Sequence, residues 1–200
     1  MKMFERIKDI VISLYLRFGE RAQILIKSAT GDTTITMTEL ATLSGLTATA
    51  AEINRTADVS ARIVNVTAAT LTLTELLHDG KTLTLNKADG QALTLPAATG
   101  SGMKSRFIVG TTITSVGTTI KVVGNDTMVG FATLAQDAAD TSVLFGASGT
   151  DDTITLNGTT TGGTKGDVIE IEDVAADLWS VRIIATATGT EATPFSATVS

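Results

Sequence analysis

The sequence predicts a mainly β protein, with an antiparallel β-sandwich or jelly-roll-like C-terminal domain. From residue 81 onward, short segments that alternate apolar residues with Thr are separated by glycine-containing turns, as is typical of this fold class. Hydrophobic residues make up 43% of the 200 residues and charged residues only 18%. No run reaches the roughly 20 apolar residues that a membrane-spanning helix needs. We therefore expect the apolar side chains to fill a sheet core or an interface between subunits.

The same patterning divides the chain into four regions. We expect an amphipathic helix or arm over residues 1–23 and a Thr-rich anchoring connector with short capped helices over 24–80. A β-rich domain is expected over 81–188, followed by a tail or arm over 189–200.

The N-terminal segment M-K-M-F-E-R-I-K-D-I-V-I-S-L-Y-L-R-F-G has the three- and four-residue apolar spacing of an amphipathic helix that ends at Gly19. Its apolar part, residues 10–16, is short for a signal peptide and no small-residue cleavage site follows it. Such a helix can lie on a membrane surface, but we expect it to dock on a partner or on neighbouring copies and to become ordered on binding. The residues predicted to form that interface are Phe4, Ile7, Val11, Leu14 and Phe18.

The connector contains an internal echo. T-I-T-M-T-E-L over residues 34–40 recurs as T-L-T-L-T-E-L over residues 70–76. Each copy predicts a short strand that leads into a helical turn, with capping boxes formed by Thr36 with Glu39 and by Thr72 with Glu75. We expect an extended region that does not bury a core of its own.

Within the β-rich domain, T-L-T-L-N over residues 82–86 and A-L-T-L-P over residues 92–96 flank the turn K-A-D-G, which predicts a β-hairpin. The remaining strands are predicted over Ser105–Val109, Thr118–Val123, Met128–Leu134, Ser142–Phe145, Asp152–Asn157, Asp167–Glu172 and Leu178–Ile184.

Two aromatic residues near the C-terminus are further interface candidates. Alternation in the last predicted strand places Trp179, Val181 and Ile183 on one face, so Trp179 is expected to be a core residue or a subunit-interface anchor. Phe195 is the one aromatic residue of a polar tail that is either disordered or an arm docking on a neighbour.

The sequence predicts no enzyme and no catalytic residue. The single histidine, His78, stands beside Asp79 near a helix end, and no G-x-S-x-G nucleophile motif occurs. With one His and no Cys, a zinc site is not expected. The Gly/Thr-rich segment 158–166 lacks a P-loop pattern and is expected to be a long hairpin loop.

We therefore predict no cofactor and no metal site, with a structural calcium ion as the one alternative that the loop aspartates leave open. None of these aspartates follows the EF-hand spacing, and we expect them to hydrogen-bond the backbone of their own turns. They are Asp126, Asp137, Asp140, Asp151, Asp152 and Asp167.

The net charge and the distribution of basic residues limit the partners that we expect. The net charge is −6 and, beyond the first two dozen residues, the basic residues are scattered, so nucleic acid is not an expected partner. Aromatic residues amount to 4%, which provides few stacking platforms for bases or sugars.

One segment resembles a known group of proteins. L-S-G-L-T-A-T-A-A-E-I-N-R-T over residues 43–56 combines a capping box, Thr49 with Glu52, with a sequence similar to one that recurs in tailed-bacteriophage virion proteins. There Val and Leu stand where this chain has Leu46 and Ile53. The segments that begin at Gly80 and at Thr153 resemble, more loosely, head-associated proteins of marine tailed phages.

The resemblance implies a structural protein of the virion. The first expectation is a capsid decoration, or cement, protein that is made in the host cytoplasm, binds the capsid exterior and bridges capsomers. Its expected partners are the major capsid protein and copies of itself, as a homotrimer, with no membrane. The alternative is a tail-fibre, neck-fibre or spike component with a host-binding β head. A small carbohydrate-binding or hydrolytic domain is the remote alternative.

Overall fold

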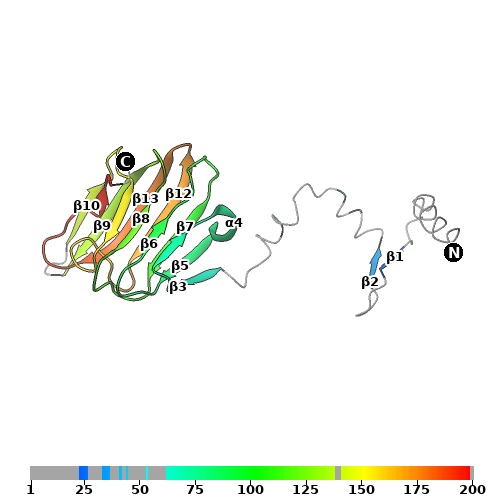
Figure 1. Ribbon diagram of the computed structural model, residues 1–200, viewed down its shortest axis with the longest axis horizontal. Helices are drawn as coiled ribbons and strands as arrows, with labels where there is room; N and C mark the ends of the chain where they lie inside the picture. Colours follow the sequence, from blue (N-terminus) through cyan, green and yellow to red (C-terminus); the bar gives the residue numbers. More distant parts are fainter. Residues whose placement is uncertain are drawn as a thin grey trace. The chain divides into compact units, whose positions relative to one another are not determined.

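The computed structural model describes residues 23–26, 33–36, 41, 44, 53, 62–137 and 141–198 (Figure 1). The chain forms two compact units, over Met1–Ile53 and Asn54–Ser200. In the first unit, strands β1 (Gln23–Ile26) and β2 (Thr33–Thr36) pair antiparallel, with Ile24 opposite Ile35. The strand predicted at the start of the first echo is therefore present. The predicted N-terminal helix, the partner Glu39 of the Thr36 capping box and the whole Thr49–Glu52 box lie outside the described residues.

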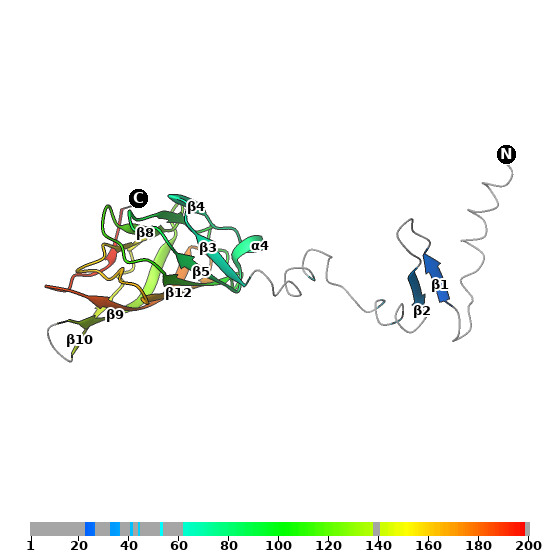
Figure 2. The ribbon, with the colours of Figure 1, turned by 90° about the horizontal axis from the view of Figure 1, so that it is seen from below.

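The second unit is a β-sandwich, as the sequence predicts (Figure 2). A seven-stranded sheet has the order β10-β9-β13-β12-β7-β5-β3, and a five-stranded sheet has the order β14-β11-β8-β6-β4. Buried apolar side chains from both sheets, such as Phe107 and Trp179 from the larger and Ile120 and Ile154 from the smaller, form one core. The two sheets therefore face each other across that core.

The seven-stranded sheet comprises β3 (Ile63–Val66), β5 (Lys81–Leu85), β7 (Lys104–Val109), β9 (Thr127–Gln136), β10 (Ser142–Gly146), β12 (Val168–Ala175) and β13 (Leu178–Ala187). The five-stranded sheet comprises β4 (Thr70–Thr72), β6 (Ala92–Thr94), β8 (Thr118–Lys121), β11 (Thr153–Leu156) and β14 (Phe195–Ser196).

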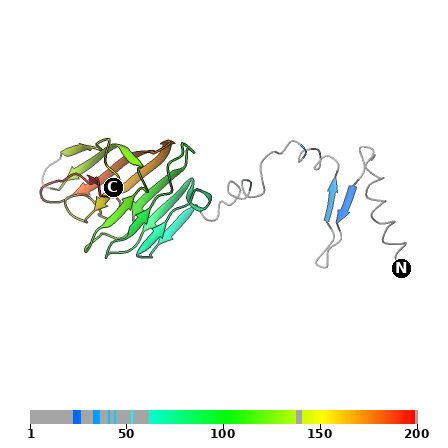
Figure 3. The same ribbon diagram turned by 45° about the horizontal axis from the view of Figure 1, so that its top comes forward.

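Both sheets are mixed rather than antiparallel. Strands β3, β5 and β7 run parallel in the larger sheet, and β4, β6 and β8 run parallel in the smaller one (Figure 3). From β3 to β8 the chain thus alternates between the sheets and winds around the core in successive coils. Parallel neighbours need a crossover connection, and here the strand in the opposite sheet provides it.

This winding makes the predicted hairpin wrong. Strands β5 and β6 lie in different sheets, although the turn between them forms as expected, with Gly90 at φ +85° and its N–H donating to the Lys87 carbonyl at 3.1 Å. Alternation shows which face of each strand is buried but not which strand is its partner. The segment 158–166 likewise joins strands of different sheets, β11 and β12, and is not a hairpin loop.

Adjacent coils stack closely at this turn. A Cβ atom on Gly90 would lie 1.9 Å from the carbonyl oxygen of Gly117, and the Thr114 N–H donates to the Ala88 carbonyl at 2.8 Å. Only a residue without a side chain fits at position 90.

The second echo forms the predicted strand and helical turn, β4 followed by α4 (Glu75–His78). Its predicted cap is wrong, because the N-cap residue is Thr74 and its side chain makes no capping hydrogen bond. Instead the Thr74 N–H donates to Nδ1 of His78, 3.0 Å away, at the other end of the turn. The imidazole of His78, only 7% exposed, thus takes the place of the capping-box carboxylate, which would accept the N–H of the N-cap residue.

The compact unit extends beyond the predicted β domain at both ends. Val66 and Leu73, which we expected in a connector without a core, are 4% and 1% exposed within the sandwich. Phe195, expected in a tail that is disordered or docked on a neighbour, lies in β14 opposite Ile154 and is 4% exposed. The sandwich thus includes residues that the sequence assigned to the connector and to the tail, where the strands β3, β4 and β14 are only two to four residues long.

Candidate interaction face

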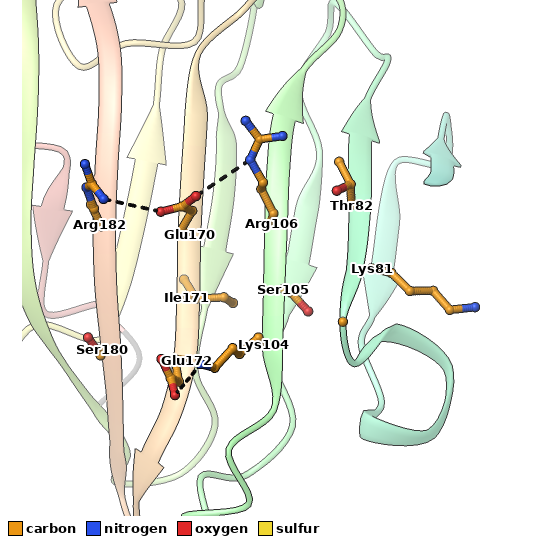
Figure 4. Close-up of a pocket in the computed structure, with 11 residues that line it drawn as sticks. Lys81, Thr82, Lys104, Ser105, Arg106, Glu170, Ile171, Glu172, Ser180 and Arg182 are labelled. Carbon is orange, nitrogen blue, oxygen red and sulfur yellow. Dashed lines mark ion pairs between the residues drawn. The ribbon is translucent and has the colours of Figure 1, made fainter. Parts of the chain in front are cut away.

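The outer face of the seven-stranded sheet carries the candidate site (Figure 4). Strands β7, β12 and β13 turn one set of alternate residues into the core and the other set outward. The outward set forms an open pocket of about 520 Å³, together with the start of β5 and with the buried residues Ser105 and Ile171 that lie between outward neighbours. Its lining residues are Gly80, Lys81, Thr82, Lys104, Ser105, Arg106, Glu170, Ile171, Glu172, Ser180 and Arg182.

Five of these residues form a ladder of ion pairs across the strands, here called the charged ladder: Lys104, Arg106, Glu170, Glu172 and Arg182. The strand register makes the ladder, because Glu170 lies opposite Arg106 on one side and opposite Arg182 on the other. Opposite charges on directly paired residues stabilise a sheet modestly.

The ladder leaves hydrogen-bonding capacity unused. Oε1 of Glu170 lies 3.7 Å from Nε of Arg106, and Oε2 lies 3.9 Å from Nη1 of Arg182. Both separations exceed a hydrogen bond, so each guanidinium keeps donors for another acceptor. The Lys104 Nζ to Glu172 Oε1 distance is shorter, 3.0 Å. The side chains are between 42% and 64% exposed, so these pairs add little to stability.

The pocket is basic although the chain is acidic. Its lining has four basic residues and two acidic ones, an excess of two positive charges, whereas the whole chain carries −6. A local excess of this sign attracts anionic groups. None of the lining residues is aromatic.

Next to the ladder, on the same outer face, lie four exposed apolar residues, here called the apolar flank: Val129, Phe131, Leu144 and Ile184. The register makes them neighbours, because Thr133 has Ile184 opposite it on one side and Leu144 on the other, and Phe131 lies opposite Arg182. Leu144 is 66% exposed and Ile184 51%. A contiguous exposed apolar group of this kind is typical of a surface that another molecule covers.

The buried aspartates hydrogen-bond backbone groups; Asp167 does so within its own turn, as predicted, whereas Asp126 and Asp152 do so with distant segments, which the prediction did not include. Asp126 accepts the N–H of Ala98 at 2.7 Å, and Asp152 accepts the N–H of Thr198 at 2.8 Å. Asp167 accepts three backbone N–H groups, those of Gly163, Thr164 and Thr186. Among the described residues, no group of three or more His, Cys, Asp or Glu is placed to hold a metal ion.

Two buried carboxyl groups, those of Asp167 and Asp173, have pKa values shifted in opposite directions. Burial raises the pKa of Asp167 above 3.8, although the N–H groups of Gly163, Thr186 and Thr164 oppose the rise. Burial also acts to raise the pKa of Asp173, but the N–H groups of Thr99, Ser101 and Gly100 and the Ser101 hydroxyl together bring it below 3.8.

The predicted interface residues fall into two groups. Phe4, Ile7, Val11, Leu14 and Phe18 lie outside the described residues. Trp179 and Phe195 are 1% and 4% exposed in the core, so Trp179 follows the core alternative and neither offers a surface to a partner of the folded chain. His78 lies at the end of a helical turn, as expected, with its ring engaged by the backbone.

Neither the charged ladder nor the apolar flank is among the features predicted from the sequence. A signal exists in the segments K-S-R of β7 and E-I-E of β12, where charged residues occupy alternate positions. Alternation places them on the outer face, but only the strand order brings the two segments together.

A comparison of the chain with models of known protein families and with curated proteins finds no match. Across the described residues, no helix has the length and apolar character needed to cross a membrane.

Proposed function

We propose that this protein is a structural component of a tailed-phage virion, and specifically a capsid decoration protein that binds the outside of the icosahedral head. The apolar flank carries the proposal, because Leu144, Ile184 and Phe131 form an exposed apolar group on the rim of an otherwise well-packed sandwich. Such a surface suits a protein that works by contact with other proteins. The resemblance of residues 43–56 to virion proteins supports the same function.

On this proposal, the apolar flank contacts the major capsid protein or a neighbouring copy in a homotrimer, and the N-terminal segment adds a second attachment. The sandwich contributes rigidity to the bridge between capsomers, since ten of its twelve strands contribute buried apolar residues to one core, from Val66 to Phe195. No enzymatic step and no cofactor enter this function.

A specific observation favours a second candidate, a tail-fibre or spike component. The pocket of about 520 Å³ beside the charged ladder has the size of a ligand site, which a host-binding head requires. In that case the outer sheet face would contact the host surface rather than the shell.

Copy number in purified virions tests the proposal. A decoration protein is expected in hundreds of copies per particle, and heads that lack it are expected to break at lower temperature or lower salt. Densitometry of virion proteins against the major capsid protein measures this number. A few copies per particle, with intact heads but lost adsorption in the deletion mutant, would reject decoration in favour of the fibre.

A further inference from the structure

We infer that the pocket on the outer face of the seven-stranded sheet binds an acidic carbohydrate, through sugar carboxylates and the hydroxyl groups beside them. The inference starts from the composition of the lining, which holds cationic, anionic and hydroxyl groups together. Each class of group recognises a different part of such a ligand.

The cationic groups fit the sugar carboxylate. Arg106 and Arg182 lie on either side of Glu170, at 3.7 and 3.9 Å from its oxygens, and one carboxylate cannot neutralise two guanidinium groups. A ligand carboxylate can therefore form charge-assisted hydrogen bonds with the donors that Glu170 leaves unused.

The anionic groups exclude a simple polyanion as the best ligand. Glu170 and Glu172 stand within the same pocket and would repel dense negative charge such as a phosphate or sulfate cluster. They are, however, good acceptors for hydroxyl donors, and Ser180 and Thr82 can both donate and accept. A ligand with hydroxyls next to a carboxylate satisfies both kinds of group at once.

The shape agrees with this chemistry. The pocket is open along the sheet face, so one sugar unit can sit in it while the rest of an oligosaccharide continues over neighbouring strands. No aromatic residue lines the pocket, so neutral sugars, which depend on stacking, are poorer ligands.

The experiment is a calorimetric titration of the purified full-length protein with trigalacturonate. Its methyl ester is the matched control, because esterification removes the carboxylate charges and leaves the sugar rings and hydroxyls. We expect trigalacturonate to bind at least tenfold more tightly than the ester. Equal binding of the two, or no binding of trigalacturonate at millimolar concentration, would overturn the inference.

Variants locate the site. The double substitution Arg106→Ala and Arg182→Ala is expected to weaken trigalacturonate binding tenfold or more. Lys121→Ala with Lys165→Ala removes the same charge from residues that do not line the pocket, and is expected to bind like the unaltered protein. Both variants should keep the unfolding temperature, since the altered side chains are exposed or partly exposed. Equal weakening by the two variants would show a non-specific charge effect and reject the site.

Glu170→Ala separates a carbohydrate site from a general anion site. Removal of this carboxylate is expected to strengthen sulfate binding, because the pocket becomes more positive, but not trigalacturonate binding, because an acceptor for sugar hydroxyls is lost. A parallel gain for both ligands, or tighter binding of hexaglutamate than of trigalacturonate in the unaltered protein, would contradict the inference. Because the purified chain is the sample, these outcomes do not depend on where the protein lies in a virion.

Discussion

The Oδ1 atom of Asp173 accepts a hydrogen bond from the backbone N–H of Gly100 at 2.8 Å, across 73 residues of sequence. Its Oδ2 atom accepts the N–H groups of Thr99 and Ser101 at 3.0 and 2.9 Å. One carboxylate near the end of β12 thus holds the loop that leads into β7, and Asp173 is 2% exposed. Because these are charge-assisted bonds to backbone groups, the loop depends on the ionised form.

Asp173→Asn is therefore expected to lower the free energy of unfolding by about 2–3 kcal/mol at pH 7. The folded-state pKa lies below 3.8, so the stabilisation is fully present above 3.8 and is lost as the pH falls through the lower, folded-state value. Urea denaturation at a series of pH values measures the difference between the two proteins. A difference that stays constant below pH 3.8 would show that ionisation of Asp173 is not its cause.

Asp167 is expected to show the opposite pH dependence. Its folded-state pKa lies above 3.8, so its contribution is fully present below 3.8 and declines as the pH rises through the folded-state value. Asp167→Asn should abolish this decline, and should cost less stability at pH 7 than Asp173→Asn because it also removes a desolvated charge. The same urea series tests both carboxyl groups, and a steeper decline in Asp167→Asn than in the unaltered protein would contradict this prediction.

Gly90→Ala is expected to destabilise the sandwich by more than about 3 kcal/mol, because the new Cβ would lie 1.9 Å from the Gly117 carbonyl oxygen. Gly102 is the control, since its φ of +76° is close to the +85° of Gly90 but a Cβ there meets nothing within 4 Å. Gly102→Ala should cost only the backbone strain, about 1 kcal/mol. Thermal unfolding of both variants distinguishes the cost of the close contact between turns from the cost of backbone strain. Equal losses of unfolding free energy would argue against the close contact at Gly90.

Phe195→Ala is expected to cost about 3–5 kcal/mol, because Phe195 is buried in the core opposite Ile154. Phe131→Ala, which removes a side chain that is 44% exposed, should cost much less. Denaturant unfolding of the isolated protein compares the two. Similar small losses would mean that the C-terminal strand does not dock on its own sandwich in solution.

Leu144→Asp is expected to reduce the number of copies on the phage head with little loss of stability, because Leu144 is 66% exposed within the apolar flank. Val116→Asp is the matched control, since Val116 is 93% exposed and lies outside the flank. Densitometry of virions assembled with each variant gives the copy number. Equal occupancy by the two variants would remove the flank from the proposed attachment surface.

The two-layer β fold and most strand positions could be predicted from alternation alone. In β13, the buried positions Trp179, Val181 and Ile183 are those that the pattern indicates. The strand order could not be predicted, because alternation in β5 and β6 gives the same buried face whether the two strands pair with each other or lie in opposite sheets.

The candidate site could not be predicted from the sequence for the same reason. Arg106, Glu170 and Arg182 are far apart in the sequence, and each alone is an ordinary outward-facing charge. They become a ladder only through the pairing of β12 with both β7 and β13. The capping of α4 by His78 was also not predictable, because the Thr-x-x-Glu pattern indicates a carboxylate, not an imidazole, as the acceptor of the N-cap N–H.

The parallel pairing of β9 with β13 means that β9 cannot complete its pairing during synthesis until β13 has also been made. Thr127 pairs opposite Leu178, so β9 leaves the ribosome about fifty residues before its partner. At ~5–20 residues per second, that is a wait of roughly 3–10 s, during which one edge of a ten-residue apolar strand is unpaired. We therefore expect the yield of folded protein to fall when expression outpaces chaperone capacity, because more chains then hold this unpaired edge at the same time.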